Sequence, residues 1–221
     1  MSLPLHIGVI GGTGQEGRGV ALRLARAGAS VIIGSRSIER ARETIDDLRG
    51  RAGELSLDAG DNGAVVDNCD VIFLAVPFAH AAGIVEAYAE RFRRASLLID
   101  VTVPVTFADR APRLTEVPEG SATEHIRRRL PERVQLAAAL KTVPARLLAG
   151  DQSLDCDDFI CGDSAEARSR ASEVLQLIPG LRPIDAGPLE TARTIERMTV
   201  LAIAINQRYK VHDARFRVVG L

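Results

Sequence analysis

Short apolar runs alternate with stretches of helical periodicity along this chain. The runs at residues 5–10, 70–76 and 96–101 lack polar alternation, which is typical of parallel strands buried on both faces. Glycine or proline marks the end of several runs. The pattern predicts strands at residues 5–10, 30–34, 55–57, 70–76, 96–101, 134–140, 158–161 and 182–186. It predicts helices at about residues 18–27, 38–49, 61–68, 79–93, 121–130, 164–178 and 190–209.

This alternation predicts an α/β fold, a Rossmann-type doubly wound parallel sheet with its ligand crevice at the carboxyl ends of the strands. Cap residues support the helix starts: Ser37 precedes the second helix, Ser121 and Glu124 form a capping box, and Asp163 or Ser164 precedes the sixth. Residues 103–119 are predicted as a loop. A chain of 221 residues can bury a sizeable core as one large domain, or as one domain with a small appendage.

The first predicted strand leads into a glycine-rich turn. In the pattern Gly12-x-Gly14-x-x-Gly17, Gly12 permits a tight turn and Gly14 lets the backbone approach a pyrophosphate. Gly17 lets the helix lie close to the strand, so that free N–H groups and the positive end of the helix dipole face the phosphates. Strand, turn, helix and second strand fit one βαβ unit, which favours dinucleotide binding over a purely structural turn. The predicted cofactor-binding residues of the turn are Gly12, Thr13, Gly14, Gln15, Glu16 and Gly17.

The end of the second strand indicates which dinucleotide binds. An NAD site carries Asp or Glu there to hold the ribose 2′-hydroxyl. This chain has Ser35 and Arg36, with Arg40 one helical turn later. A guanidinium pairs with a 2′-phosphate that a carboxylate would repel, and Thr13 supplies a further hydroxyl. We therefore predict NADP(H) over NAD(H); the alternative is that both arginines are solvated surface charges.

Composition narrows the class of protein. Hydrophobic residues make up 46% and charged residues 26%, as in ordinary globular proteins. The formal net charge of −1 gives no general attraction to nucleic acid or acidic membranes. The apolar stretch at 199–205 is too short to span a bilayer and no signal peptide is visible, so a cytoplasmic protein is expected. Cys69, Cys156 and Cys161 lack metal-ligand spacing and are interpreted as small apolar residues in a reducing compartment.

Three predicted strand ends run into turns that contain proline, at the edge where a nicotinamide ring would lie. They are Ala75-Val76-Pro77-Phe78, Thr102-Val103-Pro104 and Lys141-Thr142-Val143-Pro144. Each proline alone fits loop geometry, but three at one edge indicate a rigid rim, which hydride transfer requires. Lys141 and His80 are the candidate catalytic residues. The alternative for Lys141 is a surface lysine at a strand end, and the alternative for His80 is a helix-surface or packing role. The sequence contains no nucleophile elbow, metal signature or acid pair.

Several longer motifs carry more information than the glycine turn. They are IGVIGGTGQEGRGVALRLARAG followed by VIIGSR, DVIFLAVPFAH at 70–80, EGSAxE at 119–124, TVPA at 142–145, CGD at 161–163, GLRPxDAGPL at 180–189 and NxRYKxH at 206–212. Together they resemble the NADPH-dependent coenzyme F420 reductases, also called deazaflavin:NADP oxidoreductases, over nearly the whole chain. The C-terminal end, VHDARFRVVGL, is nearer to the bacterial members than to the archaeal ones.

The resemblance implies a single domain over residues 1–221 that passes a hydride between NADP(H) and the deazaflavin coenzyme F420. The part from about residue 180 would close the crevice and form a homodimer. By matched positions, the nucleotide contacts are Thr13, Gly14, Ser35, Arg36 and Arg40. The ring contacts are Val76, Pro77, His80, Thr102, Val103, Lys141 and Val143, and Lys141 stands where His or Asn is common in the family. The stretch at 199–205, apolar nearly all round, also predicts a helix that packs on a partner subunit.

Two other functions remain open. One is NADPH-dependent reduction of another acceptor, such as an imine, a flavin or a chelated ferric ion, with Lys141 as a proton donor. The other is a sensor that binds NADPH without turnover. Two redox rings exchange a hydride without a protein acid or base, so the lack of acid–base motifs favours the deazaflavin.

Overall fold

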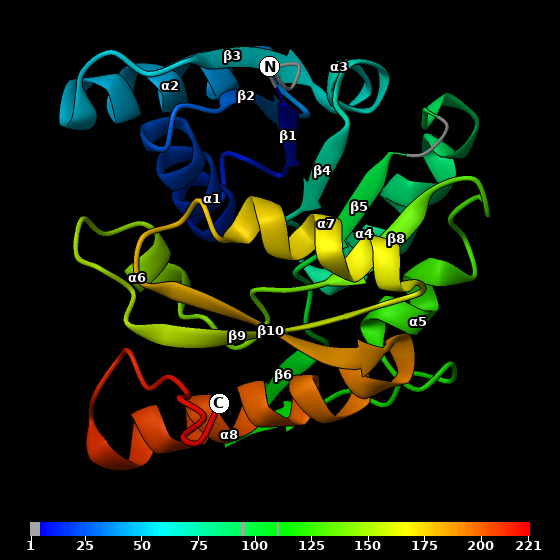
Figure 1. Ribbon diagram of the computed structural model, residues 1–221, viewed down its shortest axis with the longest axis vertical. Coiled ribbons are helices and arrows are strands. Elements are labelled where there is room, and N and C mark those ends of the chain that lie inside the picture. Colours follow the sequence, from blue (N-terminus) through cyan, green and yellow to red (C-terminus); the bar gives the residue numbers. More distant parts are fainter. Residues whose placement is uncertain (1–4, 94–95, 110) are drawn as a thin grey trace.

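The computed structural model describes residues 5–93, 96–109 and 111–221 (Figure 1). The strands are β1 (His6–Ile10), β2 (Ser30–Ser35), β3 (Leu57–Asp61), β4 (Val71–Leu74), β5 (Leu97–Asp100), β6 (Val105–Ala108), β7 (Ala111–Leu114), β8 (Gln135–Ala138), β9 (Cys156–Gly162) and β10 (Leu181–Pro188). The α-helices are α1 (Gln15–Arg26), α2 (Ile38–Ala52), α3 (Asn62–Asn68), α4 (Phe78–Ala87), α5 (Ala122–Arg127), α6 (Ala145–Leu148), α7 (Ala165–Leu175) and α8 (Ala192–Tyr209). Short 3₁₀ turns at Ala89–Arg91 and Leu189–Thr191 follow α4 and precede α8.

Eight of these strands form one sheet in the order β10-β9-β8-β5-β4-β1-β2-β3. The strands from β8 to β3 in this order are parallel, which confirms the Rossmann-type prediction. β9 pairs with β8 antiparallel, and β10 pairs with β9 parallel, so the predicted parallel arrangement does not extend to this end of the sheet. A parallel return needs a crossover that spans the sheet. The β8–β9 connection carries only the four-residue α6, which packs against α1 instead.

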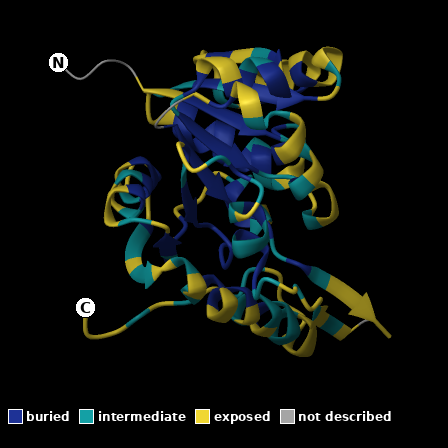
Figure 2. Cartoon of the chain, turned by 90° about the vertical axis from the view of Figure 1, so that its right-hand side faces the viewer, coloured by how far each residue is buried: buried dark blue, intermediate teal, exposed yellow. Residues whose placement is uncertain are grey.

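The core lies on both faces of the central strands. Every residue of β4 and β5 is buried. Phe73 faces one apolar cluster, with α1 and α2, while Ile72 and Leu74 face another, with α3 and α4. This alternation is the two-residue period of a strand covered on both sides. Figure 2 shows the buried strands enclosed by helices whose outer faces are exposed.

Helix caps follow the predictions closely. Ser37 Oγ accepts a hydrogen bond from Arg40 N at 3.3 Å, and Ser121 Oγ accepts one from Glu124 N at 3.1 Å. Ser164 caps α7 by accepting from Ala167 N at 3.0 Å. Asp163, the alternative cap, instead accepts from Leu136 N at 2.9 Å and so ties α7 to β8.

Two predicted segments differ from the structure. The third strand is β3, from Leu57 to Asp61, and not residues 55–57. The predicted loop at 103–119 contains the antiparallel hairpin β6–β7. Pro112 reads as a loop signal, but a proline is tolerated in an edge strand, and β7 packs against α8. Figure 1 shows β6 beside α8, on the far side of β9 and β10 from the glycine turn.

Candidate functional site

The glycine turn joins β1 to α1 with very little free space. Gly11 carries the positive φ of 78°, so the prediction that Gly12 makes the tight turn is wrong by one residue. A Cβ on Gly11 would collide with the carbonyl oxygen of Ala75. A Cβ on Gly12 would lie 2.9 Å from Ile33 Cγ2, and one on Gly17 would lie 2.5 Å from Gly11 O. Gly17 thus has the predicted role, because it lets α1 start directly against the turn.

A cavity of about 760 Å³ opens in front of this turn. It runs from the turn past the ends of β2 and β3 to β4 and the outer face of α4. Its walls include nine of the predicted cofactor-binding residues: Thr13, Gly14, Ser35, Arg36, Arg40, Ala75, Val76, Pro77 and His80. The remaining lining residues are Gly11, Ser37, Asn62, Gly83 and Ile84. Segments that are far apart in the sequence therefore form one binding surface.

The sequence reasoning missed those five residues, although some carried a signal. Gly83 and Ile84 follow His80 by three and four residues, which places all three on one face of α4. Asn62 follows Asp61, which caps α3 at the carboxyl end of β3. A polar residue at that edge of a doubly wound sheet belongs to the crevice.

Other predicted residues do not line this cavity. Gly12 and Gly17 lie beneath the turn, and Gln15 lines a separate cavity of about 220 Å³ together with Thr13 and Arg18. Glu16 is half-buried at the start of α1, and desolvation raises the pKa of its carboxyl. The predicted ring contacts at the later strand ends, Thr102, Val103, Lys141 and Val143, lie outside the cavity walls.

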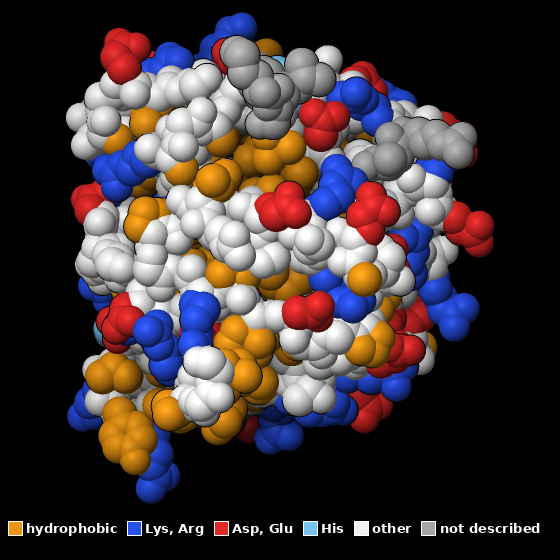
Figure 3. Space-filling model, viewed as in Figure 1, with side chains coloured by type: hydrophobic (Ala, Val, Ile, Leu, Met, Phe, Trp, Pro, Cys, Tyr) orange, Lys and Arg blue, Asp and Glu red, His pale blue; other side chains and the backbone are white. Residues whose placement is uncertain are grey.

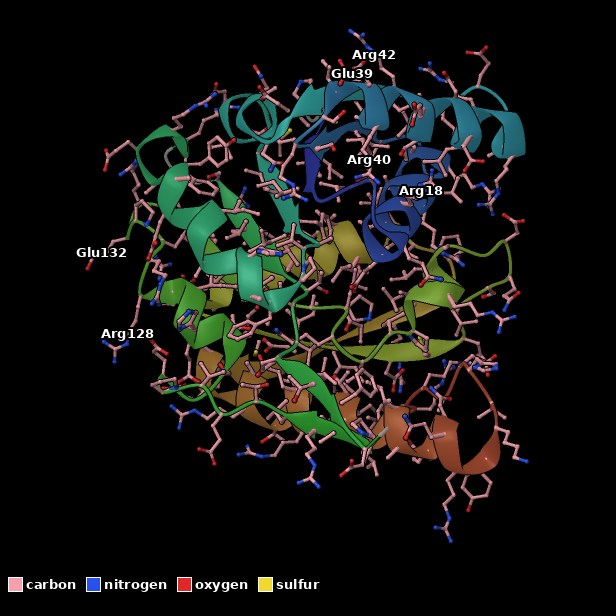
Figure 4. All side chains as sticks on the ribbon, turned by 180° about the vertical axis from the view of Figure 1, so that it is seen from behind. Arg18, Glu39, Arg40, Arg42, Arg128 and Glu132 are labelled. Carbon is pink, nitrogen blue, oxygen red and sulfur yellow. The ribbon has the colours of Figure 1, made fainter. Side chains whose placement is uncertain are left out.

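Arg36 and Arg40 give the cavity a positive mouth. Both are exposed, and within the described chain neither guanidinium has a carboxylate oxygen within 4 Å. Ser35 is buried beneath them, and its Oγ accepts a hydrogen bond from Ser37 N at 3.2 Å. Figure 4 shows Arg40 on α2 near Arg18 on α1, while Arg42 projects away from the cavity side. Unpaired guanidinium groups beside a glycine turn fit the phosphates of a dinucleotide.

Lys141 differs most from its predicted position. The sequence predicts its ammonium group at the exposed rim, but its side chain has no exposed surface. Its Nζ lies 2.9 Å from Asp100 Oδ2 and 3.1 Å from Glu196 Oε1, and it also donates to the carbonyl oxygen of Thr102. Burial alone lowers the pKa of Lys141, but the two carboxylates outweigh it and raise that pKa, so the ammonium stays charged.

Lys141 is directed into the interior by the backbone of the residue before it, Leu140, which has a left-handed conformation. Leu140 has φ 57°, which turns the chain at the end of β8. Both carboxylate oxygens of the buried Asp158 accept a hydrogen bond from Leu140 N, at 2.8 and 2.9 Å. A left-handed leucine is uncommon, and its local cost is offset by this contact with the neighbouring strand. The proline pattern in the sequence contains no sign of this turn.

Asp158 makes the stability of the fold depend on pH. Desolvation raises the pKa of its carboxyl to about 7, against the backbone hydrogen bonds, which lower it. The folded protein thus keeps a proton that the unfolded chain loses, and the free energy of unfolding falls as pH rises from about 4 to about 7. We expect Asp158→Asn to remove about 3 kcal/mol of this dependence between pH 5 and pH 8, because about two pH units of that interval lie below the pKa of about 7. Urea unfolding at the two pH values measures it.

Asp157→Asn is the matched control for that experiment. Arg182 lowers the pKa of Asp157 through hydrogen bonds of 2.7 and 2.8 Å, so its contribution is present at neutral pH and is lost as pH falls. The contribution that the control removes therefore makes the free energy of unfolding rise with pH, whereas that of Asp158 makes it fall. An unchanged pH dependence in Asp158→Asn would contradict the assignment.

The described residues contain no group of three or more His, Cys, Asp or Glu side chains that could hold a metal ion. In the same part of the chain, no helix has both the length and the apolar character needed to cross a membrane. Cys69, Cys156 and Cys161 are buried and free, and desolvation raises the pKa of each thiol.

The parallel sheet, the glycine turn and the cavity at the carboxyl ends of its strands define a dinucleotide-binding α/β protein of the Rossmann type. The family model described as "NADP oxidoreductase coenzyme F420-dependent" matches residues 6–104. The F420-dependent NADP reductase of Methanothermobacter thermautotrophicus is 38% identical over 98% of this chain and 96% of its own length. That of Methanothermobacter marburgensis is 35% identical over 98% and 99%. The chain belongs to the F420-dependent NADP reductase family, which confirms the resemblance seen in its motifs.

A crystal structure from Arthrobacter sp. FB24 has the same fold, with a TM-score of 0.80. The alignment covers 96% of this chain and 98% of the other at 23% sequence identity. Almost all of the chain therefore has a structural counterpart in a solved protein.

Proposed function

We propose that the protein transfers a hydride between NADP(H) and coenzyme F420. The observation that carries the proposal is the pair of unpaired guanidinium groups of Arg36 and Arg40 beside the glycine turn. They stand where an NAD site has an acid, in a chain that matches F420-dependent NADP reductases over almost its full length. The nicotinamide and deazaflavin rings, when bound, supply the redox chemistry.

The residues of this chain bind and align those rings. Gly14 and the first turn of α1 would hold the pyrophosphate, and Ser35 with the two arginines would hold the 2′-phosphate. Val76 and Pro77 form an apolar wall for the nicotinamide end. Among the described cavity residues, His80 is the only histidine, and no Asp, Glu, Lys, Cys or Tyr is present. That limited acid–base equipment suits hydride exchange between two rings better than reduction of an imine or carbonyl.

Lys141 acts in this proposal as a positioning residue. Asp100 Oδ1 accepts from Thr102 N at 2.9 Å, while Lys141 holds the carbonyl oxygen of the same residue. Asp100 Oδ2 also accepts from Thr123 Oγ1 at 2.7 Å, which ties the segment after β5 to α5. The lysine thereby sets the backbone of Thr102 and Val103, where the sequence predicts ring contacts.

An anaerobic assay of NADPH oxidation tests the proposed reaction. Purified protein is supplied with coenzyme F420, free flavin, a ferric chelate or a small cyclic imine, one at a time. We expect turnover with F420 at least about tenfold above that with any other acceptor, because the cavity offers alignment but little proton donation. Turnover mainly with another acceptor would replace the F420 assignment. NADPH binding without any turnover would indicate a sensor.

We further propose that the chain acts as one domain and forms a homodimer through α8. Leu201 on α8 is 52% exposed, Tyr209 at its end is 69% exposed, and Phe107 on β6 is 61% exposed. Figure 3 shows apolar side chains gathered over the lower part of the molecule, where α8 runs. Such side chains are commonly covered in an assembly. The three free cysteines support a reducing compartment and hence a cytoplasmic location.

Light scattering at micromolar concentration tests the dimer. We expect twice the chain mass of 23.7 kDa for the unaltered protein. Leu201→Glu should shift the mass toward the monomer, because it places a charge on an exposed apolar position of α8. Leu177→Glu, which makes the same change at an exposed leucine outside α8, is the control. A monomer in the unaltered protein would contradict the proposal.

A further inference from the structure

Asn62 carries a polar group on the cavity wall that the fold itself does not use. The residue is only 6% exposed, and its Oδ1 is fully buried. Neither end of its carboxamide has a hydrogen-bond partner among the described residues. Nearly all buried polar groups in native proteins are paired, so the unpaired amide of a residue that lines a cavity indicates a ligand that completes it when the side chain turns toward the cavity.

The surrounding backbone holds this carboxamide in one place. Asp61 Oδ1 accepts a hydrogen bond from Ala64 N at 2.7 Å, which caps α3 and holds its first turn at the end of β3. The carboxamide lies over Gly34, because a Cβ there would be 3.2 Å from Asn62 Oδ1. The same Cβ would lie 2.8 Å from Val65 Cγ2, so the position excludes any larger residue. Asn62 therefore lies beside the strand end that presents Ser35 and Arg36.

The chemistry of a carboxamide selects among the parts of a dinucleotide. One end donates and the other accepts, whereas a phosphate only accepts. The edge of an adenine base offers an amino donor next to a ring-nitrogen acceptor, and asparagine pairs with such an edge through two hydrogen bonds. Gly83 and Ile84 on α4 line the same cavity and give the face of a flat base an apolar surface.

We propose that Asn62 binds the adenine base of NADP(H) through the amino group of the base and an adjacent ring nitrogen. The inference rests on the proposed function, since it assigns a part of the same dinucleotide. It adds a base contact to the glycine turn and the arginines, which contact phosphates only. Asn62 would thus set affinity for the adenosine half and leave the hydride chemistry unaffected.

The test compares dissociation constants for NADP⁺ and 1,N⁶-etheno-NADP⁺, measured by calorimetry. The etheno bridge removes the amino protons of the base and keeps the 2′-phosphate. Asn62→Ala should weaken NADP⁺ about tenfold, the equivalent of one or two neutral hydrogen bonds, and the etheno analogue less than about twofold. Asn62→Leu, which keeps the branching at Cγ but removes both hydrogen-bonding groups, should show the same selectivity if the alanine variant is unstable.

Two further variants make the result specific. Asn68→Ala, an exposed asparagine at the other end of α3, should leave both dissociation constants unchanged. Arg36→Ala should weaken both ligands equally, because both carry the 2′-phosphate. Equal weakening of the two ligands in the Asn62 variants, or none in either, would overturn the adenine contact alone. Failure of the unaltered protein to bind NADP⁺ would overturn the proposed function, and the adenine contact with it.

Discussion

Replacement of Lys141 with methionine should lower the free energy of unfolding by about 3–5 kcal/mol, because it leaves two buried carboxylates without their cation. Asp100 and Glu196 have no exposed side-chain surface, so water cannot take the place of the ammonium group. For a chain of this length the loss corresponds to a melting temperature lower by roughly 6–20 °C. Differential scanning calorimetry at pH 7 measures it directly.

The pH dependence of the variant separates this role from a catalytic one. Glu196 has its pKa raised by burial and accepts from Ala122 N at 3.0 Å. Because its raised pKa lets Glu196 take up a proton at lower pH, the loss of stability should be smaller at pH 5 than at pH 8. The double variant Lys141→Met with Glu196→Gln should recover part of the lost stability, because one uncompensated charge is removed.

Turnover supplies the second criterion. If Lys141 only positions Thr102, the double variant should recover turnover together with stability. If its charge stabilises the acceptor ring, turnover in both variants should stay about 10²-fold below that of the unaltered protein. Other enzymes lose about this much when one oriented hydrogen-bond donor is removed. A fully stable Lys141→Met protein would contradict the structural role.

Arg36→Ala should weaken NADPH binding roughly 10- to 150-fold and leave NADH binding within about twofold. A hydrogen bond to a charged group contributes about 1.5–3 kcal/mol, and only NADPH carries the 2′-phosphate. Arg36 has no carboxylate partner among the described residues, so replacing it leaves no carboxylate without a cation. Fluorescence titration with both nucleotides gives the two dissociation constants.

Arg42→Ala is the matched control, because Arg42 is an exposed arginine on α2 outside the cavity walls. Figure 4 shows it projecting away from the cavity side. Its replacement removes one positive charge, as Arg36→Ala does, and should change neither dissociation constant. If Arg36→Ala weakened NADH as much as NADPH, recognition of the 2′-phosphate by this residue would be ruled out.

The features that the sequence predicted well are those that neighbouring residues decide. The run from Leu5 to Ile10, the turn with Gly14 and Gly17, and the helix behind it depend on apolar periodicity and on small side chains within one βαβ unit. Ser37, Ser121 and Ser164 cap helices through hydrogen bonds to the backbone three residues on. Ser35 and Arg36 line the cavity because β2 is parallel to β1, so both strands end at the same edge of the sheet.

The tertiary structure decided what depends on contacts between distant segments. The reversal of β9 and β10 depends on where α6 packs, and the position of Lys141 depends on a left-handed Leu140 held by a carboxylate 18 residues further on. The ammonium of Lys141 pairs with residues 41 and 55 positions away, a distance over which one-dimensional spacing carries no information. Asn62 lies at the site because Gly34 has no side chain and so leaves room for its carboxamide. Local patterns thus determined the class of fold and the phosphate-binding turn, while burial and long-range pairing determined which side chains face the cavity.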